Sequence, residues 1–124
     1  MLVAEDHPVN QRITTRFLEK LGVAWEVVAN GEEAIEALKR RDFDLVLMDV
    51  QMPVMDGLEA TLTIRKLEGL RGTHVPILAL TANVLEEHRK EAQQAGFDDY
   101  IAKPVNLEEL RVKLVKWAPK VAAV

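Results

Sequence analysis

The stretch Asp44-Leu45-Val46-Leu47-Met48-Asp49 decides the fold, because a short apolar run stops there on a carboxylate. Three further apolar runs also end on polar residues: Met1–Asp6, Pro76–Thr81 and Asp99–Lys103. Apolar strands that each end in a polar group suggest a parallel sheet. Open α/β sheets bind ligands at the carboxyl edge of their strands, so we expect the polar ends to form one site there.

The composition is that of an ordinary globular domain. The chain has 124 residues, 48% of them apolar, and a formal net charge of -4, which suits one compact domain. No basic block is present, which argues against a nucleic-acid surface. Cysteine is absent, so disulfides and thiolate metal sites are excluded. We find neither a membrane span of roughly 18 apolar residues nor a signal peptide, and we expect a cytoplasmic setting.

Strand-like and helix-like segments alternate along the chain, which predicts a parallel sheet flanked by helices. The expected strands are Leu2–Ala4, Trp25–Val28, Leu45–Met48, Ile77–Leu80 and Tyr100–Ala102. Apolar residues at helical spacing predict five helices, with core faces at Ile13/Phe17/Leu21, Ala34/Ile35/Leu38, Ala60/Ile64/Leu67, Ala92/Ala95 and Leu107/Leu110/Leu114.

Helix ends are marked by capping residues. Four cap residues each precede a glutamate by three positions, a variant of the capping box: Asn30, Asp56, Asn83 and Asn106. Gly22 and Gly96 are expected to end the first and fourth helices in a left-handed conformation. Pro119 stops the last helix, so we expect one domain over residues 1–118 and a C-terminal tail over 119–124.

The polar strand ends predict a metal site. In a doubly wound sheet of flavodoxin-like order 2-1-3-4-5, strands one and three are neighbours, so Glu5, Asp6 and Asp49 converge. Three close carboxylates need counter-charge. Lys103 supplies one positive charge, and Mg²⁺ suits the oxygen ligands. A solvated loop charge or helix cap would explain one such acid, but less readily three acids with Thr81 and Lys103.

These residues closely resemble the receiver domain of two-component response regulators. The resemblance runs from about Leu2 to Trp117. It rests on Glu5-Asp6, Asp49, Met52-Pro53-x-Met55-Asp56-Gly57, Thr81-Ala82 and Ala95-Gly96-x-Asp98-Asp99-Tyr100-x-x-Lys103-Pro104. The motif style around Glu5–Gln11 and Thr81–Asn83 is most similar to receivers of hybrid histidine kinases. The implied fold is a three-layer α/β/α sandwich with a five-stranded parallel sheet and five helices.

The resemblance implies a role for each acid at the strand ends. Asp49 is the expected phosphoacceptor. Asp6 and Asp49 are expected to bind Mg²⁺ directly, together with the backbone carbonyl of Gln51, while Glu5 acts through water. An aspartate nucleophile can form an aspartyl phosphate.

The resemblance also implies roles for residues around the acids. Lys103 pairs with the acyl phosphate, and Thr81 hydrogen-bonds it. Tyr100 is the switch aromatic, which turns inward when Thr81 moves toward the phosphate. Four residues are expected to set the geometry of the surrounding loops: Pro53, Gly57, Ala82 and Pro104, the last through a cis bond.

The expected function is signal reception. The domain takes a phosphoryl group from a histidine kinase or a histidine phosphotransfer domain and switches conformation. It then signals to an output domain or protein through the face of the fourth helix, fifth strand and fifth helix. It catalyses its own phosphorylation and slow autodephosphorylation, so it is not an enzyme acting on a free substrate. We expect this domain to contact neither nucleic acid nor membrane.

Two other classes, and a degenerate form of the receiver itself, share some of these features. A phosphohydrolase of the haloacid dehalogenase type needs a second Asp two residues after its nucleophile, where this chain has Gln51. A flavodoxin needs a Ser/Thr/Gly-rich loop where this chain has His7-Pro8-Val9-Asn10. A degenerate receiver that acts only as a binding module loses the acceptor Asp or the Lys, and this chain keeps both.

The three histidines are interpreted as surface residues.

Overall fold

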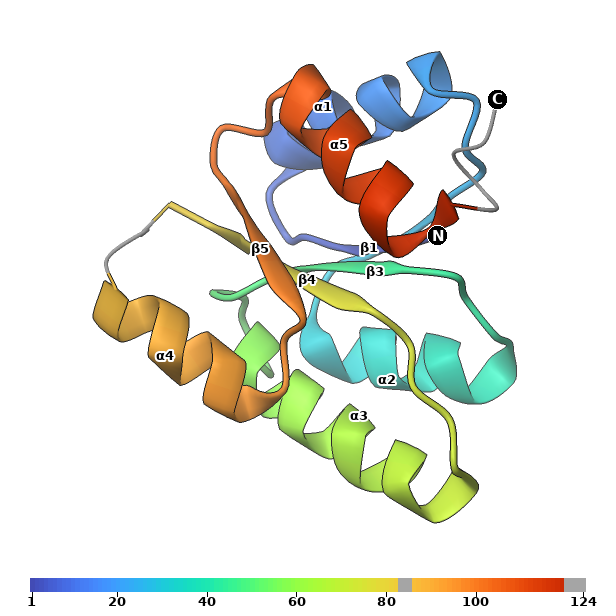
Figure 1. The fold of residues 1–124 in the computed structure, drawn as a ribbon, viewed down its shortest axis with the longest axis vertical. Coiled ribbons are helices and arrows are strands. Elements are labelled where there is room, and N and C mark those ends of the chain that lie inside the picture. Colours follow the sequence, from blue (N-terminus) through green and yellow to red (C-terminus); the bar gives the residue numbers. More distant parts are fainter. Residues whose placement is uncertain (83–85, 120–124) are drawn as a thin grey trace.

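The computed structural model describes residues 1–82 and 86–119, which form an open α/β fold (Figure 1). The strands are β1 Leu2–Ala4, β2 Glu26–Val28, β3 Val46–Asp49, β4 Ile77–Thr81 and β5 Asp99–Ala102. The helices are α1 Pro8–Lys20, α2 Gly31–Arg40, α3 Gly57–Arg71, α4 Glu86–Ala95 and α5 Leu107–Trp117. In this described part of the chain, no helix has both the length and the apolar character needed to cross a membrane.

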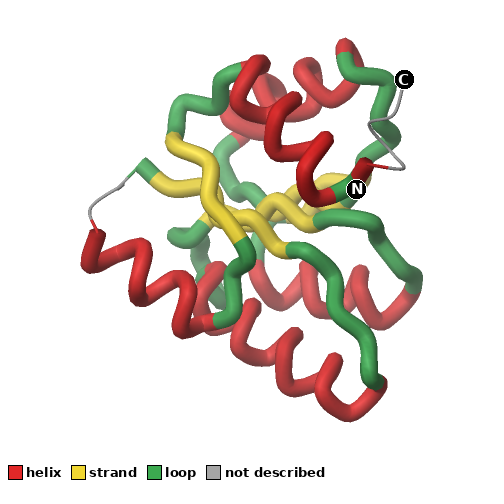
Figure 2. Tube along the Cα trace, in the orientation of Figure 1, coloured by secondary structure: helices red, strands yellow, loops and turns green. Residues whose placement is uncertain are grey.

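The sheet is parallel throughout, with the order β2-β1-β3-β4-β5. This confirms the flavodoxin-like order predicted from the sequence. Helices α1 and α5 cover one face of the sheet, and α2, α3 and α4 cover the other (Figures 1 and 2). Asp49 pairs with Leu80 and Thr81 pairs with Ala102, so the polar strand ends lie at one edge of the sheet.

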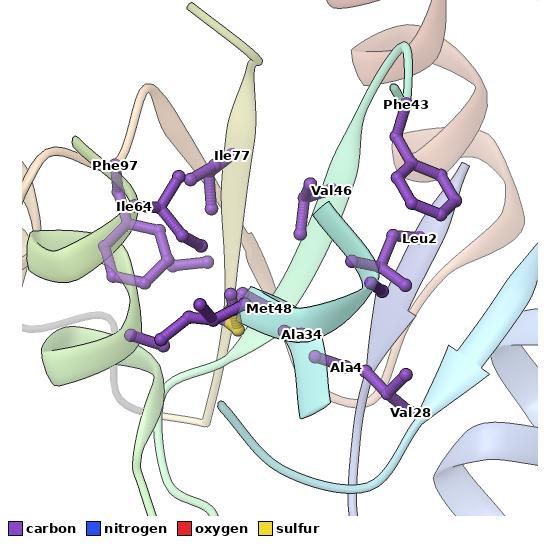
Figure 3. Packing of buried hydrophobic residues seen from close by; sticks show 14 of the residues in the cluster. Leu2, Ala4, Val28, Ala34, Phe43, Val46, Met48, Ile64, Ile77 and Phe97 are labelled. Carbon is purple, nitrogen blue, oxygen red and sulfur yellow. The ribbon is translucent and has the colours of Figure 1, made fainter. Parts of the chain in front are cut away.

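The core has two clusters, one on each face of the sheet, because neighbouring strand residues point in opposite directions. Met48 belongs to the cluster under α2 and α3, where it packs with Leu2, Val46, Ile77 and other residues (Figure 3). Leu47 belongs to the opposite cluster, together with Leu18 of α1 and Leu110 and Leu114 of α5. The apolar strands are therefore buried on both sides, as is usual in parallel sheets.

The core face of α1 differs from the prediction by one residue. The buried positions of α1 are Thr14 and Leu18, whereas the predicted stripe of Ile13, Phe17 and Leu21 is only half-buried. A strict four-residue spacing drifts around a helix that has 3.6 residues per turn. The predicted stripe therefore follows the edge of the buried face, and Leu18, which is fully buried, lies at its centre.

Most of the predicted caps are present. The side chains of Asn30, Asp56 and Asn106 accept a hydrogen bond from the backbone N–H three residues later, at 2.9, 2.9 and 3.1 Å. The predicted cap at Asn83 lies outside the described residues. Gly22 and Gly96 have positive φ as predicted, and Gly72, which was not predicted, ends α3 in the same way. The boundary between a domain over 1–118 and a tail over 119–124 stays a prediction.

Candidate functional site

Three carboxylates converge at the carboxyl edge of the sheet. Glu5 and Asp6 follow β1, and Asp49 ends β3, which pairs directly with β1. One oxygen from each of these acids lies within 4.8 Å of the others. Glu5 and Asp49 are buried, with 0% and 4% of their surface exposed, whereas Asp6 is exposed. The cluster therefore has two enclosed acids and one that faces solvent.

Lys103 joins the two buried acids. Its Nζ atom lies 2.7 Å from Oδ2 of Asp49 and 3.2 Å from Oε2 of Glu5. The backbone N–H of Lys103, just beyond β5, donates to the carbonyl of Thr81 at 2.8 Å, and the following bond to Pro104 is cis. The ammonium group of Lys103 therefore partly neutralises the two buried carboxylates.

Glu5 is held in place by several donors. Its Oε1 atom accepts from Nδ2 of Asn10 at 3.1 Å and from the backbone N–H of His7 at 3.3 Å. Its Oε2 atom accepts from Lys103. Both oxygens of Glu5 already have protein partners. Of the adjacent acids Glu5 and Asp6, Asp6 is therefore the one whose carboxylate is more available to bind a cation.

The buried charges shift each other's protonation. Burial, reinforced by the hydrogen bond and the charge of Glu5, raises the pKa of Asp49 to about 6, although Lys103 opposes the shift. For Lys103, burial alone lowers the pKa, but hydrogen bonds and charge from Asp49 and Glu5 outweigh burial and raise it. Lys103 therefore stays charged, and Asp49 is ionised at neutral pH only at a cost.

The loop after β3 packs closely against Asp49. The backbone N–H of Gln51 donates to Oδ1 of Asp49 at 3.1 Å, and the N–H of Gly57 donates to the carbonyl of Val50 at 2.9 Å. Between them, the N–H of Met55 donates to the carbonyl of Pro53 at 2.7 Å. This three-residue turn fixes the loop beside the carboxylate of Asp49.

The sequence did not reveal the residue at the tip of that turn. Val54 has a φ of 67°, and 76% of its surface is exposed. A β-branched residue in the left-handed region is a rare outlier. Strained backbone of this kind gathers at functional sites. No sequence signal marks Val54, because glycine or asparagine would be expected at such a position.

A cavity of about 190 Å³ extends from Asp49 toward Tyr100. Its lining includes Thr81, Ala82 and Lys103, three of the residues selected from the sequence. The structure therefore places the proposed switch pair, Thr81 and Tyr100, on the same cavity as Asp49.

An ion network at the opposite edge of the sheet, whose side chains are 11–17% exposed, was also not predicted. Arg65 of α3 donates to a carboxylate oxygen of Asp98 at 2.7 Å and to Glu68 at 2.5 Å. It also donates to the carbonyl oxygens of Val75 and Gly96, at 2.8 and 2.9 Å. These bonds connect α3 to the loops before β4 and β5. They lie at the amino ends of the strands, whereas the acid cluster lies at the carboxyl ends.

Among the described residues, no histidine side chain belongs to the acid cluster. His7 is exposed, and His74, with 58% of its side chain exposed, lies 2.9 Å from Asp98. The side chain of His88 lies outside the described residues.

Comparison with known proteins identifies the class. The response regulator receiver domain family matches residues 1–115, and the chain belongs to this family. Hybrid signal transduction histidine kinase K of Dictyostelium discoideum is 41% identical over 116 residues, which are 90% of this chain and 10% of the kinase. Sensor histidine kinase GacS of Pseudomonas protegens is 41% identical over 118 residues, which are 94% of this chain and 13% of GacS.

Two solved structures are similar in both fold and sequence. One is the receiver domain of sensor histidine kinase PA1611 from Pseudomonas aeruginosa, which has a magnesium ion in its active site cleft. It is 44% identical, with a TM-score of 0.85 over 94% of this chain and 93% of that one. The other shows the Saccharomyces cerevisiae phosphotransfer protein Ypd1 with the receiver domain of its response regulator Ssk1. It is 36% identical, with a TM-score of 0.92 over 98% and 89%.

Proposed function

We propose that Asp49 accepts a phosphoryl group from a phospho-histidine on a histidine kinase or a phosphotransfer protein. The contact that carries this proposal is the 2.7 Å approach of Lys103 Nζ to Asp49 Oδ2, beside two further acids. The relatives support the choice of donor, because the similar kinases are hybrid or sensor histidine kinases and the Ssk1 receiver is seen with Ypd1.

The donor set fits Mg²⁺. This ion prefers oxygen ligands and binds through one or two carboxylates while it keeps several waters. Asp6, which is exposed, and Asp49 would hold the ion, with the backbone carbonyl of Gln51, and Glu5 would act through water. When bound, Mg²⁺ supplies positive charge that stabilises the transferring phosphoryl oxygens.

The transfer exchanges one bond to phosphorus for another. A carboxylate oxygen of Asp49 attacks the phosphorus, the bond from phosphorus to the donor imidazole nitrogen breaks, and its electron pair returns to that nitrogen. Lys103 then donates to a phosphoryl oxygen in place of Asp49 Oδ2, and the hydroxyl of Thr81 donates to another. Cations and donors placed where charge develops lower the barrier.

The same groups support slow hydrolysis. Water attacks the phosphorus, the bond between phosphorus and the carboxylate oxygen of Asp49 breaks, and its electron pair returns to that oxygen as inorganic phosphate leaves. The domain thus turns over its own phosphoryl group and acts as a timed switch. A cytoplasmic setting and the lack of nucleic-acid or membrane contact remain predictions from the sequence.

The output face comprises α4, β5 and α5. Phosphorylation biases an equilibrium between two conformations of these elements, because the phosphoryl group interacts differently with each. Thr81 and Tyr100 carry the change, since both line the cavity that starts at Asp49. The downstream partner binds the conformation favoured by phosphate.

Labelling tests the acceptor. Wild type, Asp49→Asn and Asp56→Asn are incubated with a small phosphodonor and Mg²⁺, and intact mass is measured. Asp56→Asn is the matched control, because asparagine retains the helix cap that Asp56 provides. We expect one phosphoryl group on wild type and on Asp56→Asn, and none on Asp49→Asn. Labelling of Asp49→Asn at the wild-type level would overturn the proposal.

A further inference from the structure

Two cations lie beside the ring of Tyr100. Cζ of Arg89, on α4, is 4.4 Å from the ring centroid, and Nζ of Lys113, on α5, is 5.5 Å from it. A cation this close to an aromatic face is attracted by the electrons of the ring. The ring therefore has favourable contacts in its present position that it would have to exchange if it moved.

The two cations differ in how they are anchored. Nζ of Lys113 lies 2.8 Å from both carboxylate oxygens of Asp99, which also accepts from the indole N–H of Trp117 at 2.9 Å. These contacts fix Lys113 to β5 whatever Tyr100 does. Arg89 is exposed on α4 and lines the cavity that leads to Asp49. The contact with Arg89 therefore connects Tyr100 to a different element, helix α4.

Space for the ring exists on the side toward Asp49. Tyr100 pairs across the sheet with Ala79, and Thr81, two residues further along β4, points to the same face. The small side chains of Ala79 and Ala92 line the cavity that extends from Tyr100 toward Asp49. This cavity measures about 190 Å³. A cavity of roughly 150 Å³ accommodates benzene. The cavity therefore offers the ring room to move inward.

We propose that Arg89 is a positioning residue that holds the half-buried ring of Tyr100 in its resting position beside α4, and so sets how readily the domain switches. This inference rests on the proposed function, in which phosphoryl transfer to Asp49 draws Thr81 inward and the ring follows. An inward ring leaves the guanidinium of Arg89. In wild type, switching sacrifices this contact, and that cost opposes the switch. A mutation that removes the contact from the resting state removes the cost, so it favours the switched state before any phosphorylation.

The test follows the ring directly, because Tyr100 is the only tyrosine of the chain. Tyrosine labelled with ¹³C gives one set of ring signals, recorded with and without Mg²⁺ and beryllofluoride. The variants are Arg89→Met, which keeps the stem without the charge, Arg89→Lys, which restores a cation, and Lys90→Met, which removes a neighbouring exposed charge.

In Arg89→Met we expect the resting ring signal to shift part of the way toward the beryllofluoride-bound position. The apparent beryllofluoride affinity should tighten about two- to fivefold, the effect of one exposed cation–π contact. Arg89→Lys should fall between this variant and wild type, and Lys90→Met should match wild type. A purely electrostatic effect has the opposite sign, because removal of a positive charge weakens the binding of an anion.

Three outcomes separate the possibilities. If wild type itself shows no response to beryllofluoride, the proposed function fails. If wild type responds and Arg89→Met matches it in ring signal and affinity, the role of Arg89 is overturned. A double-mutant cycle with Tyr100→Leu isolates the contact. If Arg89→Met tightens binding equally in that background, Arg89 does not act through the ring, which also overturns the inference.

Discussion

A side chain at Gly57 would overlap the backbone of Asp49: a Cβ atom at position 57 would lie 2.2 Å from the carbonyl oxygen of Asp49. The N–H of Gly57 also donates to the carbonyl of Val50, the next residue. The first residue of α3 is thus pressed against the end of β3. Only glycine permits this approach, which positions the loop beside the carboxylate of Asp49.

Gly57→Ala should therefore destabilise the domain by about 1–3 kcal/mol, the usual cost of overpacking, and should slow phosphorylation of Asp49. Gly69→Ala is the matched control on the same helix, because a Cβ there meets nothing within 4 Å. It should stabilise the domain by roughly 0.5–1 kcal/mol through its helix propensity. Urea unfolding measures both, and a similar change in the two variants would contradict the close-approach argument.

The raised pKa of Asp49 predicts a pH-dependent cost. Its pKa of about 6 in the folded domain exceeds the ordinary value of 3.8, so the folded state binds the proton more tightly than the unfolded chain. Ionisation therefore opposes folding fully above pH 6, and this cost disappears as the pH falls toward 4. Asp49→Asn removes the ionisation and should be more stable than wild type at pH 8.

The pKa shift limits the stability difference between Asp49→Asn and wild type at pH 8 to about 3 kcal/mol. We expect roughly 1–2 kcal/mol, because in the variant Lys103 loses its charged partner and this loss offsets part of the gain. Chemical unfolding at pH 8 and pH 5 should show the difference shrinking on acidification. Added Mg²⁺ should reduce it at pH 8, since the ion stabilises wild type selectively. A difference that widens toward pH 5 would contradict the assigned direction.

Magnesium affinity should depend on Asp6, the exposed member of the acid cluster. Asp6→Ala should lose about tenfold or more in affinity, measured by NMR shifts of amides near the site. Asp42→Ala, an exposed acid in the loop before β3, should bind as wild type does. Affinity should also fall below about pH 6, because protons then compete for Asp49. Unchanged affinity in Asp6→Ala would place the ion elsewhere.

The sequence predicted the sheet and its edge because both follow from local signals. Apolar runs that stop on Asp49, Thr81 or Lys103 specify where each strand ends, and parallel strands bring these ends to one edge. The caps at Asn30 and Asp56 fixed the starts of α2 and α3 for a similar reason, since a cap acts within three residues.

Features that depend on distant residues were not predictable in this way. Arg65 meets Asp98 across 33 positions of sequence, and Arg89 meets Tyr100 only because α4 packs beside β5. No periodic pattern marks such pairs. Val54 was missed for another reason: its left-handed backbone opposes the intrinsic preference of valine and is imposed by the surrounding turn.

Thr81 and Tyr100 both line the cavity that begins at Asp49, between that residue and the proposed output face. Thr81 ends β4 on the same side of the sheet as Ala79, which pairs with Tyr100. A phosphoryl group on Asp49 adds oxygens that the Thr81 hydroxyl can bond by moving inward. That movement vacates space beside a cavity of about 190 Å³, and an aromatic ring can fill it. Packed interiors favour two discrete arrangements, so the two movements should occur together.

Thr81→Ala should therefore still accept a phosphoryl group at Asp49 but lose most of the beryllofluoride-induced shift at Tyr100. The coupling at stake is of the order of 1–3 kcal/mol, the usual range between linked sites. Thr15→Ala, the same change on α1 across the sheet, should keep the full response. NMR of each protein with and without beryllofluoride makes the comparison. If Tyr100 responds equally in Thr81→Ala and wild type, the signal reaches the output face by a route that does not use the Thr81 hydroxyl.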